Sequence, residues 1–171
     1  ALLTYRVDSL WQAVDAAAAT GGKTVSDWNA TGVSIDSRTL KTGDLFVALR
    51  GPNFEGHNYV VDAFERGASA ALISYKPKGI NTNIPILEVS DTFAGLNNLG
   101  IAGRARTEAK IIALTGSVGK TSVKEAIAKL LSKQARVSYS YGGLNNEYGV
   151  PLSLARLPEN AEFGVFELLS L

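Results

Sequence analysis

The chain has 171 residues, of which 46% are hydrophobic and 19% charged, with a formal net charge of +1. This length allows one large or two small domains, and the balanced charge argues against a nucleic-acid binder that works by bulk electrostatics. Cysteine is absent, which excludes disulfides and thiolate metal sites, and no apolar run approaches the roughly 18 residues that span a bilayer. We therefore expect no nucleic-acid partner and no membrane insertion.

The first part of the chain alternates short apolar segments with turn-forming residues, and this pattern predicts a small α/β domain over residues 1–106. Asp8 or Ser9 is expected to cap a first helix, which the glycine pair after Thr20 ends. The other predicted elements are strands near 32–35, 45–49, 70–74 and 86–89, a short helix at 60–66, and a helix from Asp91 or Thr92 to about Arg106.

The second part, residues 107–171, repeats strand and helix, with elements predicted at 110–115, 119–133, 136–141, 149–156 and 163–168. This alternation predicts a parallel sheet with helices on its faces, so the fold class is α/β throughout. About three strands would leave an apolar sheet edge open. We therefore expect an incomplete domain of the P-loop type and a chain that is a fragment of a longer protein.

A glycine-containing loop follows the apolar strand Ile111–Leu114, and its sequence is Thr115-Gly116-Ser117-Val118-Gly119-Lys120-Thr121-Ser122. Such a loop turns backbone N–H groups toward a phosphate at the start of a helix, with the lysine near the terminal phosphates and the Thr121 hydroxyl on Mg²⁺. The strict P-loop pattern fails, because Leu114 stands where it requires glycine. The context supports the motif, because an apolar stripe of helical spacing follows it, made of Val123, Ala126, Ile127, Leu130 and Leu131.

Four segments in the same order resemble the Mur ligases, and most closely those of the MurF type. The segments are Asp36–Leu49 with Gly51, Gly56-His57 and residues 63–72 behind it, Thr115–Ser122, Gly143–Leu152, and Val165–Glu167. The second of these is similar to the family's own shortened phosphate loop, which accounts for the missing first glycine. The resemblance implies a UDP-precursor-binding domain over 1–106, followed by the start of a central ATP-binding domain.

The resemblance also implies roles for individual residues. ATP would lie on Thr115, Gly116, Ser117, Val118, Gly119, Lys120, Thr121, Ser122, Asn145 and Asn146, with Lys120 as the catalytic residue. Mg²⁺ would lie on Thr121 and Glu167, and the uridine diphosphate would contact Ser37, Arg38, Asn53 and His57. Without the resemblance, Arg38 could instead form a surface salt bridge, and the two asparagines could as well belong to an ordinary loop. His57 is a lone histidine, which is more often structural than catalytic.

The reaction implied for the full-length protein joins D-alanyl-D-alanine to UDP-N-acetylmuramoyl-tripeptide with ATP, through a phosphorylated substrate carboxylate that the dipeptide amine attacks. A monomer in the bacterial cytoplasm is expected, and ligation by these 171 residues alone is not. Two alternatives stay open at this point. The chain could be a non-catalytic module that binds the UDP precursor, or an unrelated P-loop NTPase with no affinity for uridine diphosphates.

Overall fold

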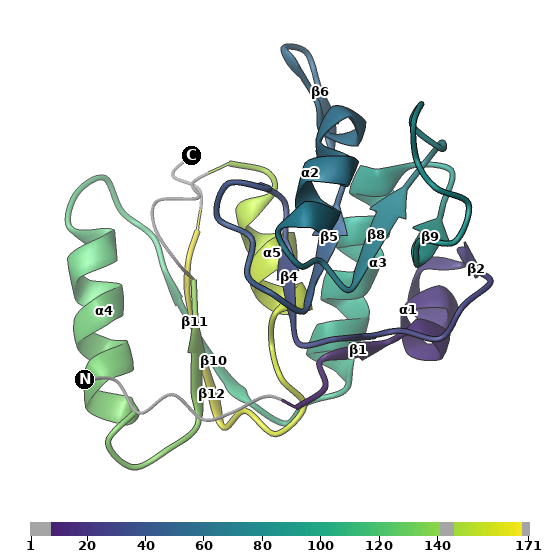
Figure 1. Cartoon of the computed structure of the whole chain (residues 1–171). Helices are drawn as coiled ribbons and strands as arrows, with labels where there is room; N and C mark the ends of the chain where they lie inside the picture. Colours follow the sequence, from purple (N-terminus) through teal and green to yellow (C-terminus); the bar gives the residue numbers. More distant parts are fainter. Residues whose placement is uncertain (1–7, 141–145, 169–171) are drawn as a thin grey trace. The chain divides into compact units, whose positions relative to one another are not determined.

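A computed structural model describes residues 8–140 and 146–168 of the chain (Figure 1). The chain forms two compact units, one from residues 8–99 and the other from residue 100 onward. In the described ranges, no helix combines the length and apolar character that crossing a membrane would require.

The unit of residues 8–99 is built on a five-stranded sheet in the order β2-β9-β8-β5-β4, parallel except for the β2–β9 pair. These strands are β2 (Lys23–Thr24), β4 (Gly32–Ser34), β5 (Asp44–Val47), β8 (Ala70–Ile73) and β9 (Ile86–Glu88). Every residue of β5 and β8 is buried, as expected for central strands of a parallel sheet that is covered on both faces.

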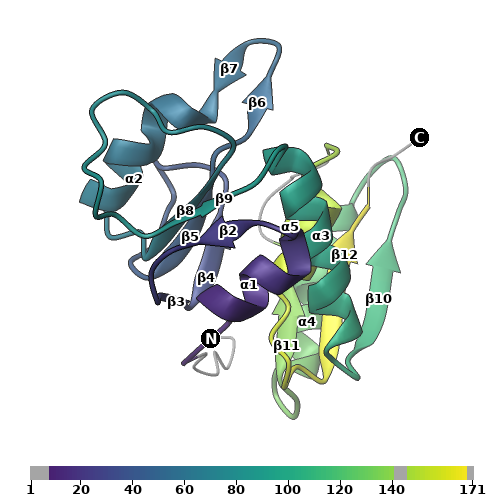
Figure 2. The same cartoon turned by 90° about the vertical axis from the view of Figure 1, so that its right-hand side faces the viewer.

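Helices cover both faces of this sheet. Phe46 and Ile73 pack on one face against Val60 and Ala63 of α2 (Val60–Glu65). Helix α1 (Ala13–Thr20) lies against β2 and β9, and the first half of α3 (Thr92–Ala105) reaches Leu72 through Gly95. The unit also contains β1 (Trp11–Gln12) paired with β3 (Asn29–Ala30), the hairpin β6 (Arg50–Gly51) and β7 (Phe54–Glu55), which extends away from the sheet in Figure 2, and the 3₁₀ turn η1 (Gly56–Tyr59).

The second unit contains a three-stranded parallel sheet in the order β10-β12-β11. Its elements are β10 (Lys110–Leu114), α4 (Lys120–Leu131), β11 (Val137–Tyr139), α5 (Gly149–Ala155) and β12 (Phe163–Glu167). Helix α4 lies on one side of the strands and α5 on the other (Figure 1). Side chains therefore alternate between two small cores, so that Val165 packs toward α4 whereas Phe166 packs against Leu154 of α5.

Two glycines of α3 allow a close helix contact inside this second unit. A Cβ atom on Gly103 would lie 2.3 Å from the carbonyl oxygen of Leu154, and one on Gly100 would lie 3.0 Å from the carbonyl oxygen of Pro151. Both oxygens belong to the backbone of α5, which therefore approaches α3 more closely than a side chain at Gly103 permits and leaves little room for one at Gly100.

The α/β class and the predicted parallel sheets are confirmed. The first helix starts later than predicted, because residues 11–12 pair with 29–30 as a strand and the helix begins at Ala13. Asp91 caps α3 as predicted, since its carboxylate accepts hydrogen bonds from the N–H groups of Phe93 at 2.8 Å and Ala94 at 3.0 Å. The division of the chain into two compact units falls between residues 99 and 100, inside α3. The boundary between the two functional domains after residue 106 stays a prediction.

Candidate functional site

The loop between β10 and α4 is open to solvent. All five residues Thr115–Gly119 are exposed, and Val118 at its tip keeps 90% of its surface accessible. Gly116 has φ 141° and Gly119 has φ 78°, values that side chains with a Cβ atom rarely adopt. A Cβ atom at Gly119 would meet nothing within 4 Å, so space remains on that side of the loop. The glycines are therefore needed for the path of the chain, and the loop stays accessible.

Helix α4 begins at this loop without a side-chain cap, because its N-cap residue is Gly119. The first N–H groups of a helix have no partner within the helix and carry partial positive charge, which together favour an anion. Lys120 adds an ammonium group, and its Nζ donates to the backbone oxygen of Leu168 at 3.3 Å. The arrangement suits a phosphate group at the start of α4.

Glu167 ends the central strand β12 and is 5% exposed. Alternation along the strand places its side chain on the same face as Val165, under α4. The Thr121 hydroxyl donates to its carboxylate, with distances of 3.1 Å to Oε1 and 3.0 Å to Oε2. The N–H of Glu167 donates to the Ser140 hydroxyl at 3.1 Å, which fixes the end of the strand. A residue of the first turn of α4 and a strand residue 46 positions apart thus meet beside the open loop.

Thr121 and Glu167 offer the hard oxygen donors that Mg²⁺ prefers, so their chemistry fits this ion. Within residues 8–140 and 146–168, no three His, Cys, Asp or Glu side chains are grouped so as to hold a metal ion. A cation here would therefore take most of its ligands from water or from phosphate oxygens.

Of the two asparagines that were predicted to contact the nucleotide, Asn145 lies outside the described residues. Asn146 is exposed, its side chain accepts a hydrogen bond from the N–H of Tyr148 at 3.2 Å, and its carbonyl accepts one from Gly149 at 3.1 Å. Asn146 therefore forms the turn that leads into α5, and its contact with a nucleotide stays a prediction.

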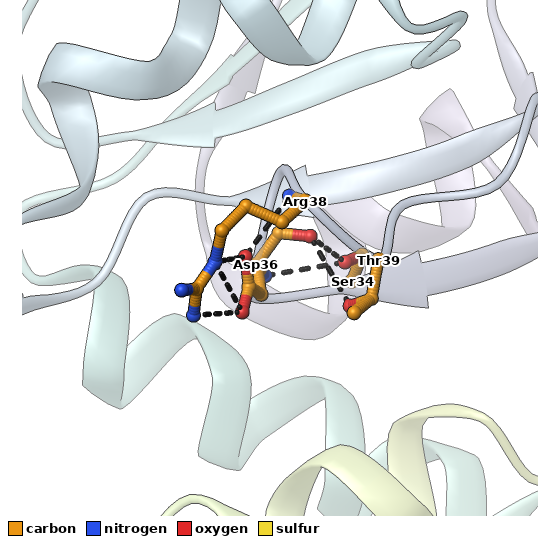
Figure 3. Close-up of polar contacts among 4 residues, drawn as sticks. All are labelled: Ser34, Asp36, Arg38 and Thr39. Atoms are coloured by element: carbon orange, nitrogen blue, oxygen red, sulfur yellow. Dashed lines mark hydrogen bonds and ion pairs between the residues drawn. The ribbon is translucent and has the colours of Figure 1, made fainter.

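The predicted substrate residues Ser37 and Arg38 follow β4 in the unit of residues 8–99. Figure 3 shows Arg38 beside Asp36. The Arg38 side chain is 83% exposed and forms a salt bridge with Asp36, from Nη2 to Oδ2 at 2.8 Å and from Nε to Oδ1 at 3.0 Å. The hydrogen bond from Arg38 lowers the pKa of the Asp36 carboxyl. Ser37 is buried, and a hydrogen bond from its side chain lowers the pKa of Asp62. Asp36 therefore holds an exposed guanidinium in place at the surface.

The other two predicted substrate residues lie on or after the β6–β7 hairpin. Asn53 is exposed in the turn, whereas the His57 side chain is fully buried. His57 Nδ1 lies 2.6 Å from Oε1 of Glu55, and its Nε2 accepts the N–H of Ser74 at 2.9 Å. Nδ1 must then carry the proton, and the ring also stacks on Tyr75 with 4.0 Å between centroids. These contacts join the hairpin to the end of β8, so the structural interpretation of His57 accounts for its surroundings.

The acid stability of this unit follows from its carboxyl groups. Burial alone would raise the pKa of Glu55, but hydrogen bonds from His57 bring it below its ordinary value, and the pKa values of Asp36 and Asp62 are lowered as well. Unfolding restores ordinary values of about 3.9–4.3, so the unfolded state takes up protons first as the pH falls. We expect the stabilisation to be complete above about pH 5 and to be lost as the pH falls below about 4.

Thermal unfolding followed by tryptophan fluorescence measures this effect, because both tryptophans of the chain, Trp11 and Trp28, are buried in this unit. The midpoint temperature of unfolding should decrease as the pH is lowered from about 5 to about 3. The variant carrying Glu55→Gln and Asp62→Asn should show a flatter profile, whereas Glu65→Gln, at an exposed position, should follow the wild type. Equal slopes for all three proteins would contradict the assignment.

Comparisons with known proteins bear on both units. The family model described as "Mur ligase family, catalytic domain" matches residues 29–103, and the "Mur ligase middle domain" matches residues 114–170. The UDP-N-acetylmuramoyl-tripeptide–D-alanyl-D-alanine ligase of Rickettsia prowazekii is 38% identical over 159 residues, which are 93% of this chain and 35% of that protein. This chain belongs to the Mur ligase family.

Solved structures agree with this assignment. A crystal structure of MurF from Acinetobacter baumannii matches 98% of this Mur ligase chain and 37% of its own, with a TM-score of 0.76 and 34% identity. The MurF ligase of Thermotoga maritima, solved in complex with ADP, matches 80% of this chain and 31% of its own, with a TM-score of 0.56 and 30% identity. The chain thus spans about a third of the length of these relatives.

One residue of the site in this Mur ligase escaped the sequence analysis. The predicted stripe of α4 is wrong for Val123 and Leu130, which are 49% and 63% exposed, and for Ala126, which is also exposed, although Ile127 and Leu131 pack on the core. Lys124 takes the place of an apolar residue on the buried face and is 0% exposed. Its spacing was the available signal, because position 124 shares a helical face with Ile127 and Leu131.

Proposed function

We propose that this chain is part of an ATP-dependent ligase that adds D-alanyl-D-alanine to UDP-N-acetylmuramoyl-tripeptide during peptidoglycan precursor synthesis. In this proposal the unit from residue 100 onward binds ATP, and the unit of residues 8–99 binds the UDP end of the precursor. The names of the curated relatives and the order of the two family matches support it.

The observation that carries the proposal is the meeting of the Thr121 hydroxyl and the Glu167 carboxylate beside the exposed loop, within 3.0–3.1 Å. We propose this oxygen pair as ligands of Mg²⁺, with the N–H groups at the start of α4 and the ammonium of Lys120 holding the phosphates of the nucleotide. Bound Mg²⁺ would neutralise charge on the phosphoryl group that is transferred to the substrate carboxylate. The loop N–H groups and Lys120 would orient and stabilise the same phosphate oxygens.

On the other unit, Arg38 supports the uridine diphosphate assignment. Its guanidinium is exposed, and the salt bridge with Asp36 fixes its direction, so that little conformational freedom is lost when an anion binds. Ser37 and His57 are buried, with contacts to Asp62 and Glu55 respectively, and we propose that they shape this site by holding the chain around it.

The proposal is tested with Lys120→Ala. We expect the affinity for ADP, measured by isothermal titration calorimetry, to fall about tenfold or more, because a charge-assisted hydrogen bond to phosphate contributes about 1.5–3 kcal/mol. Lys129→Ala removes an exposed lysine from the same helix and should leave the affinity unchanged. Binding of a UDP-N-acetylmuramoyl peptide should be the same in all three proteins.

The outcomes separate the three functions that the sequence left open. ADP binding without any uridine diphosphate binding would favour an unrelated NTPase, and uridine diphosphate binding alone would favour a precursor-binding module. An equal loss of ADP affinity in Lys129→Ala and Lys120→Ala would contradict the placement of the phosphate site.

A further inference from the structure

Lys124 is a charged residue at a position where burial is costly. The residue is 0% exposed, and its Nζ lies 3.5 Å from Oε2 of Glu167, which is itself buried. Removing an ammonium group from water is unfavourable unless an opposite charge lies beside it. The family resemblance gave Lys124 no role. From the buried face of α4, Lys124 forms an ion pair with Glu167.

The Glu167 carboxylate is already neutralised and hydrogen-bonded by the protein. Lys124 provides the opposite charge at 3.5 Å, and Thr121 donates its hydroxyl at 3.0 Å. Lys120 brings a second ammonium group to the same end of the strands, where it donates to the Leu168 carbonyl. Two positive groups therefore accompany one carboxylate.

This balance disfavours a free divalent cation. Mg²⁺ binds to proteins through one or two carboxylates together with phosphate oxygens, and the described residues provide no further acidic cluster for it. A nucleotide changes the balance, because its phosphates bring several negative charges to the start of α4.

We infer that Lys124 is a positioning residue that holds the Glu167 carboxylate against the Thr121 hydroxyl and makes binding of a divalent cation depend on bound nucleotide. The inference rests on the proposed nucleotide site. In the absence of nucleotide, the Lys124 ammonium neutralises the Glu167 carboxylate in place of a metal ion. The metal then enters with the phosphates, and the site does not fill with metal alone.

The test uses Mn²⁺ as a paramagnetic substitute for Mg²⁺, with bound and free ion measured by electron paramagnetic resonance. The wild-type chain should bind Mn²⁺ at least tenfold more weakly without ADP than with it, after the binding of Mn²⁺ to ADP in solution is subtracted. Lys124→Gln removes the charge but keeps an N–H donor for the carboxylate, and Lys124→Met removes both. Both variants should bind Mn²⁺ without ADP at least tenfold more tightly than the wild type.

Lys129→Met, at an exposed position of the same helix, should behave as the wild type. A general loss of stability would not produce a gain of metal affinity, and the glutamine variant remains informative if the methionine variant does not fold. Wild-type affinity for Mn²⁺ that is equal with and without ADP would overturn the inference, and so would folded Lys124 variants that do not gain Mn²⁺ binding.

Titration of ADP in the presence of a chelator separates this inference from the proposed function. Absence of ADP binding both there and with Mn²⁺ would reject the nucleotide site itself. ADP binding together with nucleotide-independent Mn²⁺ binding would reject only the role of Lys124.

Discussion

Glu167→Ala is expected to lower the free energy of unfolding of the unit from residue 100 onward by ~3–5 kcal/mol, the cost of removing one partner from a buried ion pair. The change leaves the ammonium of Lys124 buried without its carboxylate and removes the acceptor of the Thr121 hydroxyl. It also removes a side chain that is 5% exposed at the end of the central strand. Hydrogen exchange of peptides from β10, β12 and α4 measures the loss locally.

Glu162→Ala is the matched control, because Glu162 also forms an ion pair, with Arg136, but both side chains are about half exposed and the distance is 3.7 Å. Such a pair contributes about 0–1 kcal/mol. The double variant Lys124→Leu and Glu167→Leu should regain most of the stability, since apolar residues often replace a buried ion pair without loss. Equal costs for Glu167→Ala and Glu162→Ala would show that burial of the Lys124–Glu167 pair contributes nothing.

Gly103→Ala is expected to destabilise the same unit by ~1–3 kcal/mol, the usual cost of forcing an extra carbon into a packed contact. The added methyl group would lie 2.3 Å from the Leu154 carbonyl oxygen and 3.2 Å from its carbon, and these backbone atoms can yield only if α5 moves. Helix propensity alone predicts the opposite sign, because alanine is favoured over glycine by about 0.8–1.0 kcal/mol in a helix.

Gly100→Ala provides the graded comparison, since its nearest atom, the Pro151 carbonyl oxygen, lies at 3.0 Å. We expect a smaller loss there, in which propensity and crowding partly cancel. Urea unfolding followed by circular dichroism measures both variants. A Gly103→Ala protein as stable as the wild type would mean that α3 and α5 separate at little cost.

Much of the fold was predictable because its longer elements carry local signals. The buried strand β8 is apolar throughout and β5 is apolar after Asp44, both strands are bounded by turn residues, and Asp91 marks the start of α3. The strands β1, β2, β3, β6 and β7 were not predicted, because two residues are too few to show a period. These strands exist only through pairing with a partner strand elsewhere in the chain, and the sequence of a two-residue segment does not reveal that partner.

The candidate site divides in the same way. The glycine-containing loop between β10 and α4 could be predicted because Gly116, Gly119, Lys120 and Thr121 lie close together in the sequence. Only the family resemblance brought Thr121 and Glu167 together. The contact of Glu167 with Lys124 could not be predicted, because it joins residues more than forty positions apart and depends on which face of β12 meets α4. The burial of Lys124 opposes the ordinary preference of lysine for solvent, so composition alone assigns it to the wrong side of the helix.

Helix α4 has no side-chain cap, because its N-cap residue is Gly119. In many other helices a serine, threonine or aspartate completes the first turn. In the proposed function an anion from outside would do so. A phosphate bound to the first N–H groups would complete the hydrogen bonding of the first turn, so that nucleotide binding would also stabilise the start of the helix.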